Sequence, residues 1–288
     1  MAHTHTHSHA ADSHGADSHG AESQGGHSHL AEMLDLDADV LHEYHRDVIT
    51  WVGSHVTDRP RIVDLGAGTG TGSTALASHL PAAKITAIDM DESMLEHLRE
   101  RVDTLGLADR VRAVRADLDQ PWPELGPADM VWASASMHHM ADPADAVRQA
   151  FATLRPGGLF VITEIDSFPR FLTDPAGAAL EDRCHAGLDA RRAEAGLHMH
   201  EDWSARLSAA GFAIEAVRQF DIALRPPLPS AASRYAQVSM ERMRHGLEGR
   251  ISPEDMAALG QMVADLDAGR DDLTVRTART VWLARRPA

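Results

Sequence analysis

The sequence of 288 residues predicts an α/β fold with a doubly wound sheet. Between residues 61 and 165, short apolar runs typical of buried parallel strands alternate with segments of helical periodicity. The first run leads into a loop with three closely spaced glycines, and an acidic residue stands at or just past the end of each of the first three runs. Because ligands of such sheets bind beyond the carboxyl ends of the strands, the same features predict a binding site there.

Two segments precede the first predicted strand. Residues 1–29 carry eight histidines among small polar residues and almost nothing that could enter a core, so we expect a disordered tail. Its imidazoles can converge on Ni²⁺, Cu²⁺ or Zn²⁺ in vitro, but no catalytic metal site is expected. Residues 37–56 have apolar positions at helical spacing and predict a helix at the sheet edge or over the ligand. Its polar and aromatic side chains Tyr44, His42 and His45 are expected to divide between packing and solvent.

The core then alternates strands and helices. Apolar runs predict five strands, over 61–65, 84–88, 111–115, 129–133 and 159–165. Helical periodicity predicts helices over 71–80, 90–105 and 143–154. Asp142 and Pro143 provide an N-cap and a first-turn proline for the third of these helices. The alternation implies a parallel sheet with helices on both faces.

Beyond residue 165 the regular alternation stops. Further helices are expected over 166–200, 203–210, 232–247 and 253–266, and further strands over 212–220 and 277–285. We expect the helical insertions to form a cap over the strand ends. The chain therefore divides into a disordered His-rich tail (1–29) and an N-terminal helical cap (30–58). The core comes in three parts (59–165, 201–223 and 276–288), and two helical cap insertions (166–200 and 224–275) separate them.

Three acids are expected at the strand ends, and each has a chemical use. Asp64 can anchor the glycine loop or accept a hydrogen bond from a ligand amino group. Asp89 is placed to accept from both hydroxyls of a ribose, and Asp117 can receive the exocyclic amine of an adenine. One acid at a strand end is usually a helix cap or a solvated turn. Three in this order favour a nucleoside ligand, and the glycines, which reach positive φ and lack Cβ, let backbone approach it.

The motifs resemble those of class I S-adenosylmethionine-dependent methyltransferases of the small-molecule, natural-product type. Val63–Gly70, with the sequence VDLGAGTG, resembles the first motif of that family, and Asp89 matches its ribose acid. Ala116-Asp117-Leu118 matches its adenine position, and Leu154–Leu159 its turn before the fifth strand. The resemblance implies a Rossmann-like, seven-stranded methyltransferase sheet, with an antiparallel seventh strand between the fifth and sixth, and S-adenosyl-L-methionine as cofactor. The cofactor-binding residues that it implies are Asp64, Gly66, Ala67, Gly68, Asp89, Met90, Asp117, Leu118 and Ser134.

Two alternatives remain open at this point. An NAD(P)-dependent oxidoreductase also uses a strand, a glycine loop and an acid for ribose. However, the glycines here run Gly66-x-Gly68-x-Gly70 rather than G-x-G-x-x-G, and an acid such as Asp117 is not part of the dehydrogenase fingerprint. A non-catalytic cofactor-binding or metal-binding protein is the second alternative.

Methyl transfer requires the acceptor to be aligned with the sulfonium methyl and shielded from water. For a hydroxyl acceptor a base helps, and His138 and His139 lie in the loop after the fourth strand. Glu164 and Asp166, at the end of the fifth strand, are placed to orient a histidine or to accept the proton. This arrangement is similar to that of natural-product sugar O-methyltransferases, so His138, His139 and Asp166 are the candidate catalytic residues, His139 with the more structural role. Secondary candidates in the cap are His198 and His200.

Charge and composition limit the partners. Acids outnumber bases 43 to 27, a net charge of −16, which disfavours nucleic acid. No apolar run approaches the roughly 18 residues of a membrane span, and the first residues lack the apolar core of a signal peptide. Cys184 is the only cysteine, which agrees with a cytoplasmic protein. We expect a small-molecule substrate, and a homodimer is left open.

Overall fold

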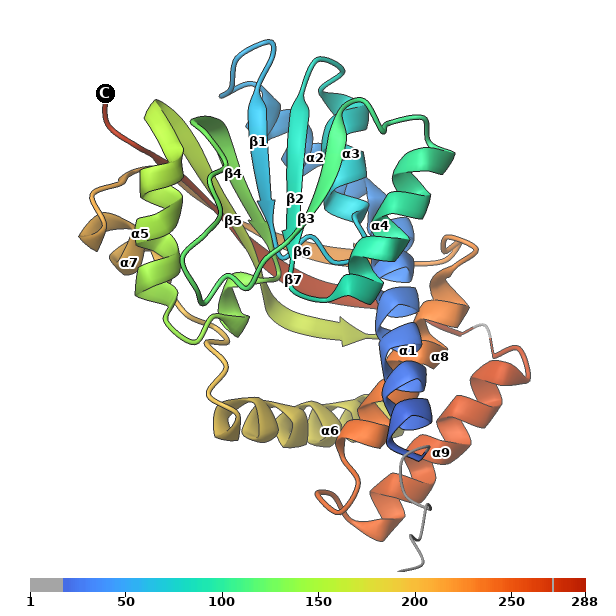
Figure 1. The fold of residues 1–288 in the computed structure, drawn as a ribbon. Coiled ribbons are helices and arrows are strands. Elements are labelled where there is room, and N and C mark those ends of the chain that lie inside the picture. The colour runs from blue at the N-terminus through green and yellow to red at the C-terminus, as the bar shows by residue number, and fades with distance from the viewer. Residues whose placement is uncertain (1–17, 271) are drawn as a thin grey trace, which may run out of the picture.

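A seven-stranded sheet with the order β3-β2-β1-β4-β5-β7-β6 forms the centre of the computed structural model, which describes residues 18–270 and 272–288 (Figure 1). The first five strands are parallel to one another. The last strand in the chain, β7, is antiparallel to both neighbours, as the family resemblance implied. The strand bounds are β1 Arg61–Leu65, β2 Lys84–Asp89, β3 Val111–Arg115, β4 Ala128–Ser134, β5 Leu154–Arg170, β6 Ala213–Leu224 and β7 Val275–Arg285.

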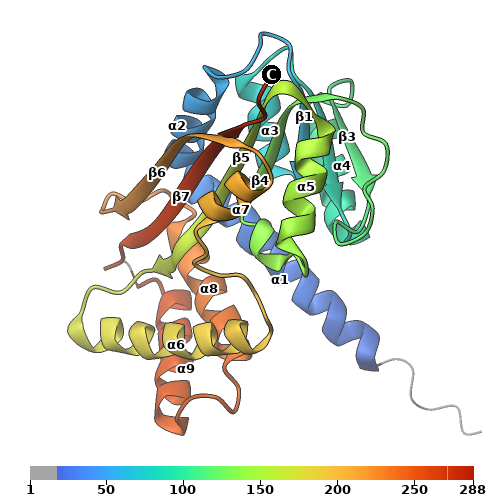
Figure 2. The same ribbon diagram turned by 90° about the vertical axis from the view of Figure 1, so that its left-hand side faces the viewer.

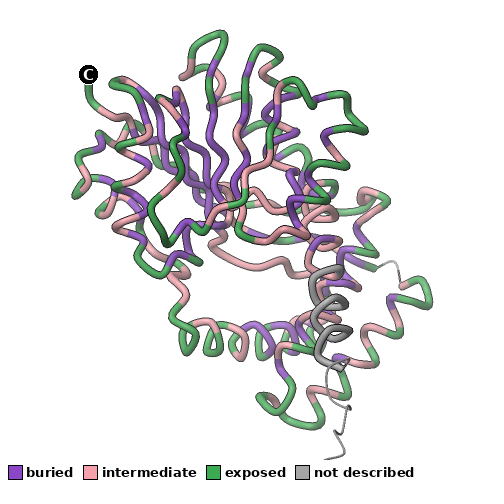
Figure 3. Tube along the Cα trace, viewed as in Figure 1, coloured by how far each residue is buried: buried purple, intermediate pink, exposed green. Residues whose placement is uncertain are grey.

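Helices cover the two faces of the sheet in separate groups (Figures 1 and 2). On one face lie α2 (His42–Gly53), α3 (Thr71–His79) and α4 (Glu92–Thr104), and on the other α5 (Pro143–Thr153) and α7 (Trp203–Ala209). Alternate residues of a strand enter opposite cores: Val161 and Leu283 belong to the α2–α3 side, and Phe160 and Trp282 to the α5–α7 side. Burial on both sides is why these strands are almost continuously apolar, and Figure 3 shows the buried chain concentrated there.

Capping residues confirm several of the expected helix starts. Asp142 accepts from Asp145 N at 3.0 Å, and Pro143 occupies the first turn of α5. Asp91 caps α4 by accepting from Ser93 N at 2.8 Å, which moves the start of this helix two residues beyond the expected one. No helix in the described part of the chain is long and apolar enough to cross a membrane.

The cap consists of α6 (Pro175–Glu194), α8 (Ala232–Gly246) and α9 (Pro253–Asp267), which lie together beyond the carboxyl ends of the strands (Figure 2). β5 continues to Arg170, so the first residues of the expected cap segment 166–200 belong to the sheet. The reason is that β5 keeps pairing with β7 as far as Arg170 opposite Arg276, across two irregularities.

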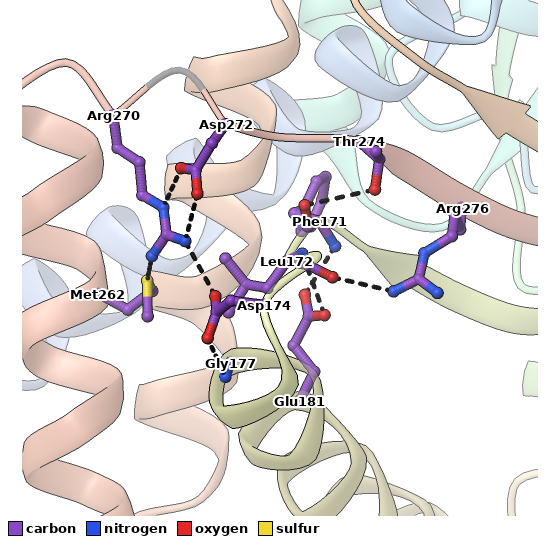
Figure 4. A network of polar contacts seen from close by, with 10 residues as sticks. All are labelled: Phe171, Leu172, Asp174, Gly177, Glu181, Met262, Arg270, Asp272, Thr274 and Arg276. Atoms are coloured by element: carbon purple, nitrogen blue, oxygen red, sulfur yellow. Dashed lines mark hydrogen bonds and ion pairs between the residues drawn. The ribbon is translucent and has the colours of Figure 1, made fainter.

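A polar network fastens the cap to the ends of β5 and β7 (Figure 4). The buried Glu181 of α6 accepts from the backbone N–H groups of Phe171 at 2.7 Å and Leu172 at 3.2 Å. Asp174 caps α6 at Gly177 and also accepts from Arg270, which follows α9. These contacts give hydrogen-bond partners to backbone N–H groups just past the end of β5, and they fix the position of α6 relative to the sheet.

The N-terminal region differs from the sequence expectation. Residues 18–29, assigned to a disordered tail, form the first turns of α1 (Ser18–Val40), while residues 1–17 lie outside the described residues. Helix extension from an anchored segment needs no new nucleus, which explains why α1 continues into weakly apolar sequence. The single helix expected over 37–56 is interrupted at Leu41, because His42 Nδ1 bonds the carbonyl of Asp39 at 2.9 Å.

Candidate functional site

The glycine loop joins β1 to α3 and needs its glycines for two reasons. Gly66, Gly68 and Gly70 have φ values of 65°, 53° and 79°, a region that glycine occupies at little cost. A Cβ on Gly66 would lie 2.6 Å from Ser136 Cβ, so the loop also requires close approach to the chain after β4. Between them, Ala67 N donates to Ile88 O of β2 at 2.9 Å. The loop thus presents bare backbone at the carboxyl ends of β1, β2 and β4.

Asp89 is held against this loop. Its Oδ2 accepts from Gly68 N at 2.8 Å, and its Oδ1 accepts from Asp91 N at 2.9 Å. A carboxylate has about four acceptor sites, so these two bonds leave capacity for a ligand. The next residue, Met90, is 64% exposed. Among the described residues, the other exposed large apolar side chains, Leu105 and Val217, are less exposed than Met90.

Asp64 lies beneath the loop rather than at its surface. The residue is 2% exposed, and its Oδ2 accepts from Ser73 Oγ of α3 at 2.6 Å. Burial raises the pKa of Asp64 to about 7 against the lowering effect of that hydrogen bond. Of the two uses expected from the sequence, this contact matches the anchoring of the loop.

The remaining predicted cofactor residues stand at the ends of β3 and β4. Asp117 is exposed, with one carboxylate oxygen accepting from Asp119 N at 3.0 Å, and Leu118 is buried beside it. Ser134 is half-buried and pairs with Thr163 of β5. All the predicted cofactor residues therefore gather along one edge of the sheet.

A histidine that follows β4 and a carboxylate within β5 form a buried pair. His138 lies in the one-turn helix η1 (Met137–His139) and is 5% exposed, and Glu164 of β5 is 6% exposed. His138 Nδ1 and Glu164 Oε2 are 2.6 Å apart, and His138 N donates to Glu164 Oε1 at 3.3 Å. Because a carboxylate accepts, Nδ1 carries a proton and donates it to Glu164. In the described part of the chain, Nε2 has no hydrogen-bond partner.

The acid that the sequence placed in the catalytic set, Asp166, lies elsewhere. Its Oδ2 accepts from Thr280 Oγ1 of β7 at 2.7 Å, and the partner of His138 is Glu164. Sequence reasoning named Glu164 only as an alternative, because strand alternation places residues 164 and 166 on the same face and does not rank them. In the part of the chain that the structure describes, Asp166 makes no hydrogen bond or ion pair with either histidine of η1.

His139 and the cap histidines have different surroundings. His139 is exposed, its ring lies 4.1 Å from that of His138, and partial burial together with this neighbour lowers its pKa. His198 N donates to His138 O at 3.0 Å, so the segment after α6 contacts η1 through backbone. His200 is exposed and has φ of 58°.

Helix α1 contributes contacts that sequence reasoning missed. Asp35 accepts from Thr69 Oγ1 of the glycine loop at 2.6 Å and pairs with Arg101 of α4 at 2.5 Å. Leu34 Cδ1 would lie 3.2 Å from a Cβ on Gly68. An acid every few residues in a helix looks like an ordinary solvated face, so the pattern gave no signal for this contact.

A second buried polar cluster joins α1 to the sheet. Arg279 of β7 donates to Asp37 Oδ1 at 2.7 Å, and Tyr235 of α8 donates to the same oxygen at 2.5 Å. Tyr44 of α2 shares a 2.7 Å hydrogen bond with Thr163. Burial would raise the pKa of Asp37, but Arg279, His45 and Tyr235 outweigh it and lower the pKa to about 2. The cluster lies on the α2 side of β5, opposite the His138–Glu164 pair.

No group of three or more histidine, cysteine or acidic side chains able to hold a metal ion occurs among the described residues. The arrangement is an edge of bare backbone and carboxylates at the carboxyl ends of the strands, with an imidazole of η1 held by Glu164 of β5. Such a site can bind a nucleoside-bearing cofactor and remove a proton from a second molecule.

Comparison with known proteins agrees with this geometry. Residues 62–158 match a family model described as a methyltransferase domain. The chain is 28% identical over 186 residues to 27-O-demethylrifamycin SV methyltransferase of Amycolatopsis mediterranei, covering 64% of this chain and 65% of that enzyme. The chain thus covers less than two thirds of the length of this curated relative.

Solved structures show the same fold at lower identity. The [4+2]-cyclase SpnF superposes with a TM-score of 0.52 at 23% identity, covering 84% of this chain and 81% of that one. A geranyl diphosphate methyltransferase in complex with SAM gives a TM-score of 0.51 at 15% identity, covering 88% and 90%. Because one of these proteins is a cyclase, the fold alone does not fix the reaction.

Proposed function

We propose that this chain, whose residues 62–158 form a methyltransferase domain, transfers the methyl group of S-adenosyl-L-methionine to a hydroxyl group of a small molecule. The family model and the methyltransferase relative support the reaction class. Neither comparison supports the oxidoreductase alternative. The observation that carries the choice of a hydroxyl acceptor is the buried pair of His138 and Glu164, 2.6 Å apart.

The residues of the loop edge fit the cofactor. The glycine loop presents backbone in the positive-φ region at the carboxyl end of β1, and Asp89 is fixed by two backbone N–H groups with acceptor sites remaining. Asp89 would hold the ribose hydroxyls, Asp117 and Leu118 the adenine, and the backbone of the glycine loop the amino-acid end. Bound there, the cofactor supplies an electrophilic methyl group.

The chain's own residues then act on the acceptor. Nε2 of His138 would take the proton of the acceptor hydroxyl, and the cofactor would supply the methyl group and leave as S-adenosylhomocysteine when its carbon–sulfur bond breaks. Glu164 holds the ring through Nδ1–H and stabilises the imidazolium that forms. Most of the remaining rate enhancement comes from alignment, which can contribute roughly 7–11 kcal/mol. The cap would close this space to water.

The test is a labelled-methyl assay against a panel of small molecules with free hydroxyl, amino or activated carbon positions. We expect label on oxygen, dependent on His138. His138→Ala should abolish turnover of that acceptor and leave the affinity for S-adenosylhomocysteine unchanged. Labelling confined to nitrogen or carbon with full activity in His138→Ala would contradict the base role. Screening metabolites made by neighbouring genes would follow.

We further infer that the protein works in the cytoplasm on a small-molecule substrate. Cys184 is buried and unpaired, as suits a reducing compartment, and the net charge of −16 is the wrong sign for nucleic acid. A homodimer stays a hypothesis that sedimentation would test.

A further inference from the structure

A hollow lies at the opposite end of the sheet from the glycine loop. Its volume is about 390 Å³, and it is formed at the amino ends of β1, β2 and β3 with the chain that leads into β4. Arg61 and Lys84, which line it, are the first residues of β1 and β2, whereas Asp64 and Asp89 stand near the other end. At about 3.3 Å per residue, a strand of five or six residues separates the two sites by roughly 15 Å.

The hollow is open because no helix covers this part of the sheet. Between β3, which ends at Arg115, and β4, which begins at Ala128, the chain contains no helix or strand. Only the amino ends of the strands are polar on that face. Thr86 lies opposite Arg112 in the β2–β3 register, and Lys84 opposite Arg61 in β1–β2. Val63, opposite Thr86, is already buried, so the polar surface is confined to the first residues of the strands.

Its lining is strongly positive. Four basic residues, namely Arg61, Lys84, Arg110 and Arg112, line the hollow together with one acid, Asp109. The whole chain has a net charge of −16, so this concentration of cations runs against the composition.

Within residues 18–270 and 272–288, no carboxylate pairs with the arginines of the lining. Arg61 Nη2 donates to Leu125 O at 3.4 Å, Arg110 Nη1 to Ala77 O at 2.6 Å, and Arg112 Nε to Thr86 Oγ1 at 2.9 Å. Lys84 pairs with Asp109 at 3.9 Å. Side-chain bonds to neutral oxygens hold the guanidinium groups in place and leave their charge and several N–H donors available.

We propose that this hollow is a second binding site, for a small anion that carries two or more phosphate groups. A volume of this size suits a small ligand, and the basic side chains in the lining supply N–H donors for the oxygens of phosphates. Arginine forks bind such groups through paired hydrogen bonds. The site is separate from the methyl-transfer edge and does not depend on the function proposed for it.

The experiment is calorimetric titration of the full chain with inorganic pyrophosphate at low salt. We expect saturable one-site binding that saturating S-adenosylhomocysteine does not displace. The double variant Arg61→Gln/Arg112→Gln should weaken it about tenfold or more, as loss of charge-assisted hydrogen bonds requires. The matched control is Arg99→Gln/Arg148→Gln, two exposed arginines on α4 and α5 outside the lining, which should bind as the unaltered chain does.

Several results would overturn the proposal. If pyrophosphate gave no saturable heat, or if the control variant lost as much pyrophosphate affinity as the double variant, the anion would be attracted only non-specifically. Citrate binding as tightly as pyrophosphate would remove the preference for phosphate, and displacement by S-adenosylhomocysteine would place the anion at the other site. A dimer in sedimentation that Arg112→Gln dissolves would mean that a second copy covers the hollow.

Discussion

His138 and Glu164 show how two ordinary residues acquire a role through their surroundings. Each is almost fully buried, and a buried ionisable group is stable only when it is paired and hydrogen-bonded. Their 2.6 Å contact meets that need and at the same time fixes the imidazole tautomer. The same contact therefore serves stability and the proposed chemistry.

At this scale the first prediction separates Glu164 from Asp166. Glu164→Gln removes the charge that stabilises the imidazolium, so kcat should fall on the order of 10²-fold with the affinity for S-adenosylhomocysteine unchanged. Asp166→Asn, which alters a hydrogen bond to Thr280, is the matched comparison and should cost less. Steady-state kinetics of both variants with one acceptor checks this. A larger fall in Asp166→Asn would return the orienting role to the residue chosen from the sequence.

The position of the glycine loop and of Asp89 and Asp117 at the strand ends could be predicted from sequence, because they follow directly from the apolar runs that precede them. The side-chain partners could not. Asp64 bonds Ser73 under the loop, and Asp166 bonds a threonine more than a hundred positions away in β7. Such partners depend on the order of strands in the sheet, which the local pattern does not contain.

At the scale of the elements, the glycine loop allows a prediction about stability, because two of the chain's positive-φ glycines differ in their surroundings. Gly66→Ala meets both a positive φ and the Cβ of Ser136 at 2.6 Å, whereas Gly157, with φ of 78°, has open space around it. Gly157→Ala should therefore lose about 1 kcal/mol of unfolding free energy from backbone strain alone. Gly66→Ala should lose clearly more and also weaken cofactor binding. Denaturant unfolding and calorimetry of the two variants measure the difference, and equal losses would show that close approach to Ser136 is unimportant.

Helix α1 is held to the rest of the molecule by the buried pair of Asp37 and Arg279, which gives a second prediction for an element. Asp37→Asn leaves the guanidinium without its carboxylate and should cost about 3–5 kcal/mol of unfolding free energy near neutral pH. Asp39→Asn, two residues further along α1 and exposed, should cost almost nothing.

The pH dependence of that difference has a definite sign. Because the folded state lowers the pKa of Asp37 to about 2, its contribution is fully present above the ordinary aspartate value of about 3.9. It is lost as the pH falls from there toward 2. Unfolding curves of the unaltered chain and Asp37→Asn should therefore converge in acid. A difference that grows as the pH falls would contradict the ion-pair account.

In the whole molecule, alternation of strands and helices was sufficient to predict the core, including the inverted last strand once the family resemblance was recognised. The arrangement of the cap and of α1 was not predictable in the same way. Their anchors include polar contacts, such as Glu181 to the chain after β5 and Asp35 to Thr69, between segments that are separate in the chain. Long-range polar contacts leave no periodic trace in a sequence, whereas apolar faces do.

The most direct test of the central claim, that a nucleoside cofactor lies across the glycine loop with its ribose on Asp89, is calorimetric titration with S-adenosylmethionine and S-adenosylhomocysteine. We predict saturable binding of both to the unaltered chain at one site, and a loss of affinity of about tenfold or more in Asp89→Ala, because a charge-assisted contact to the ribose disappears. Absence of binding in the unaltered chain, or unchanged affinity in Asp89→Ala, would contradict it.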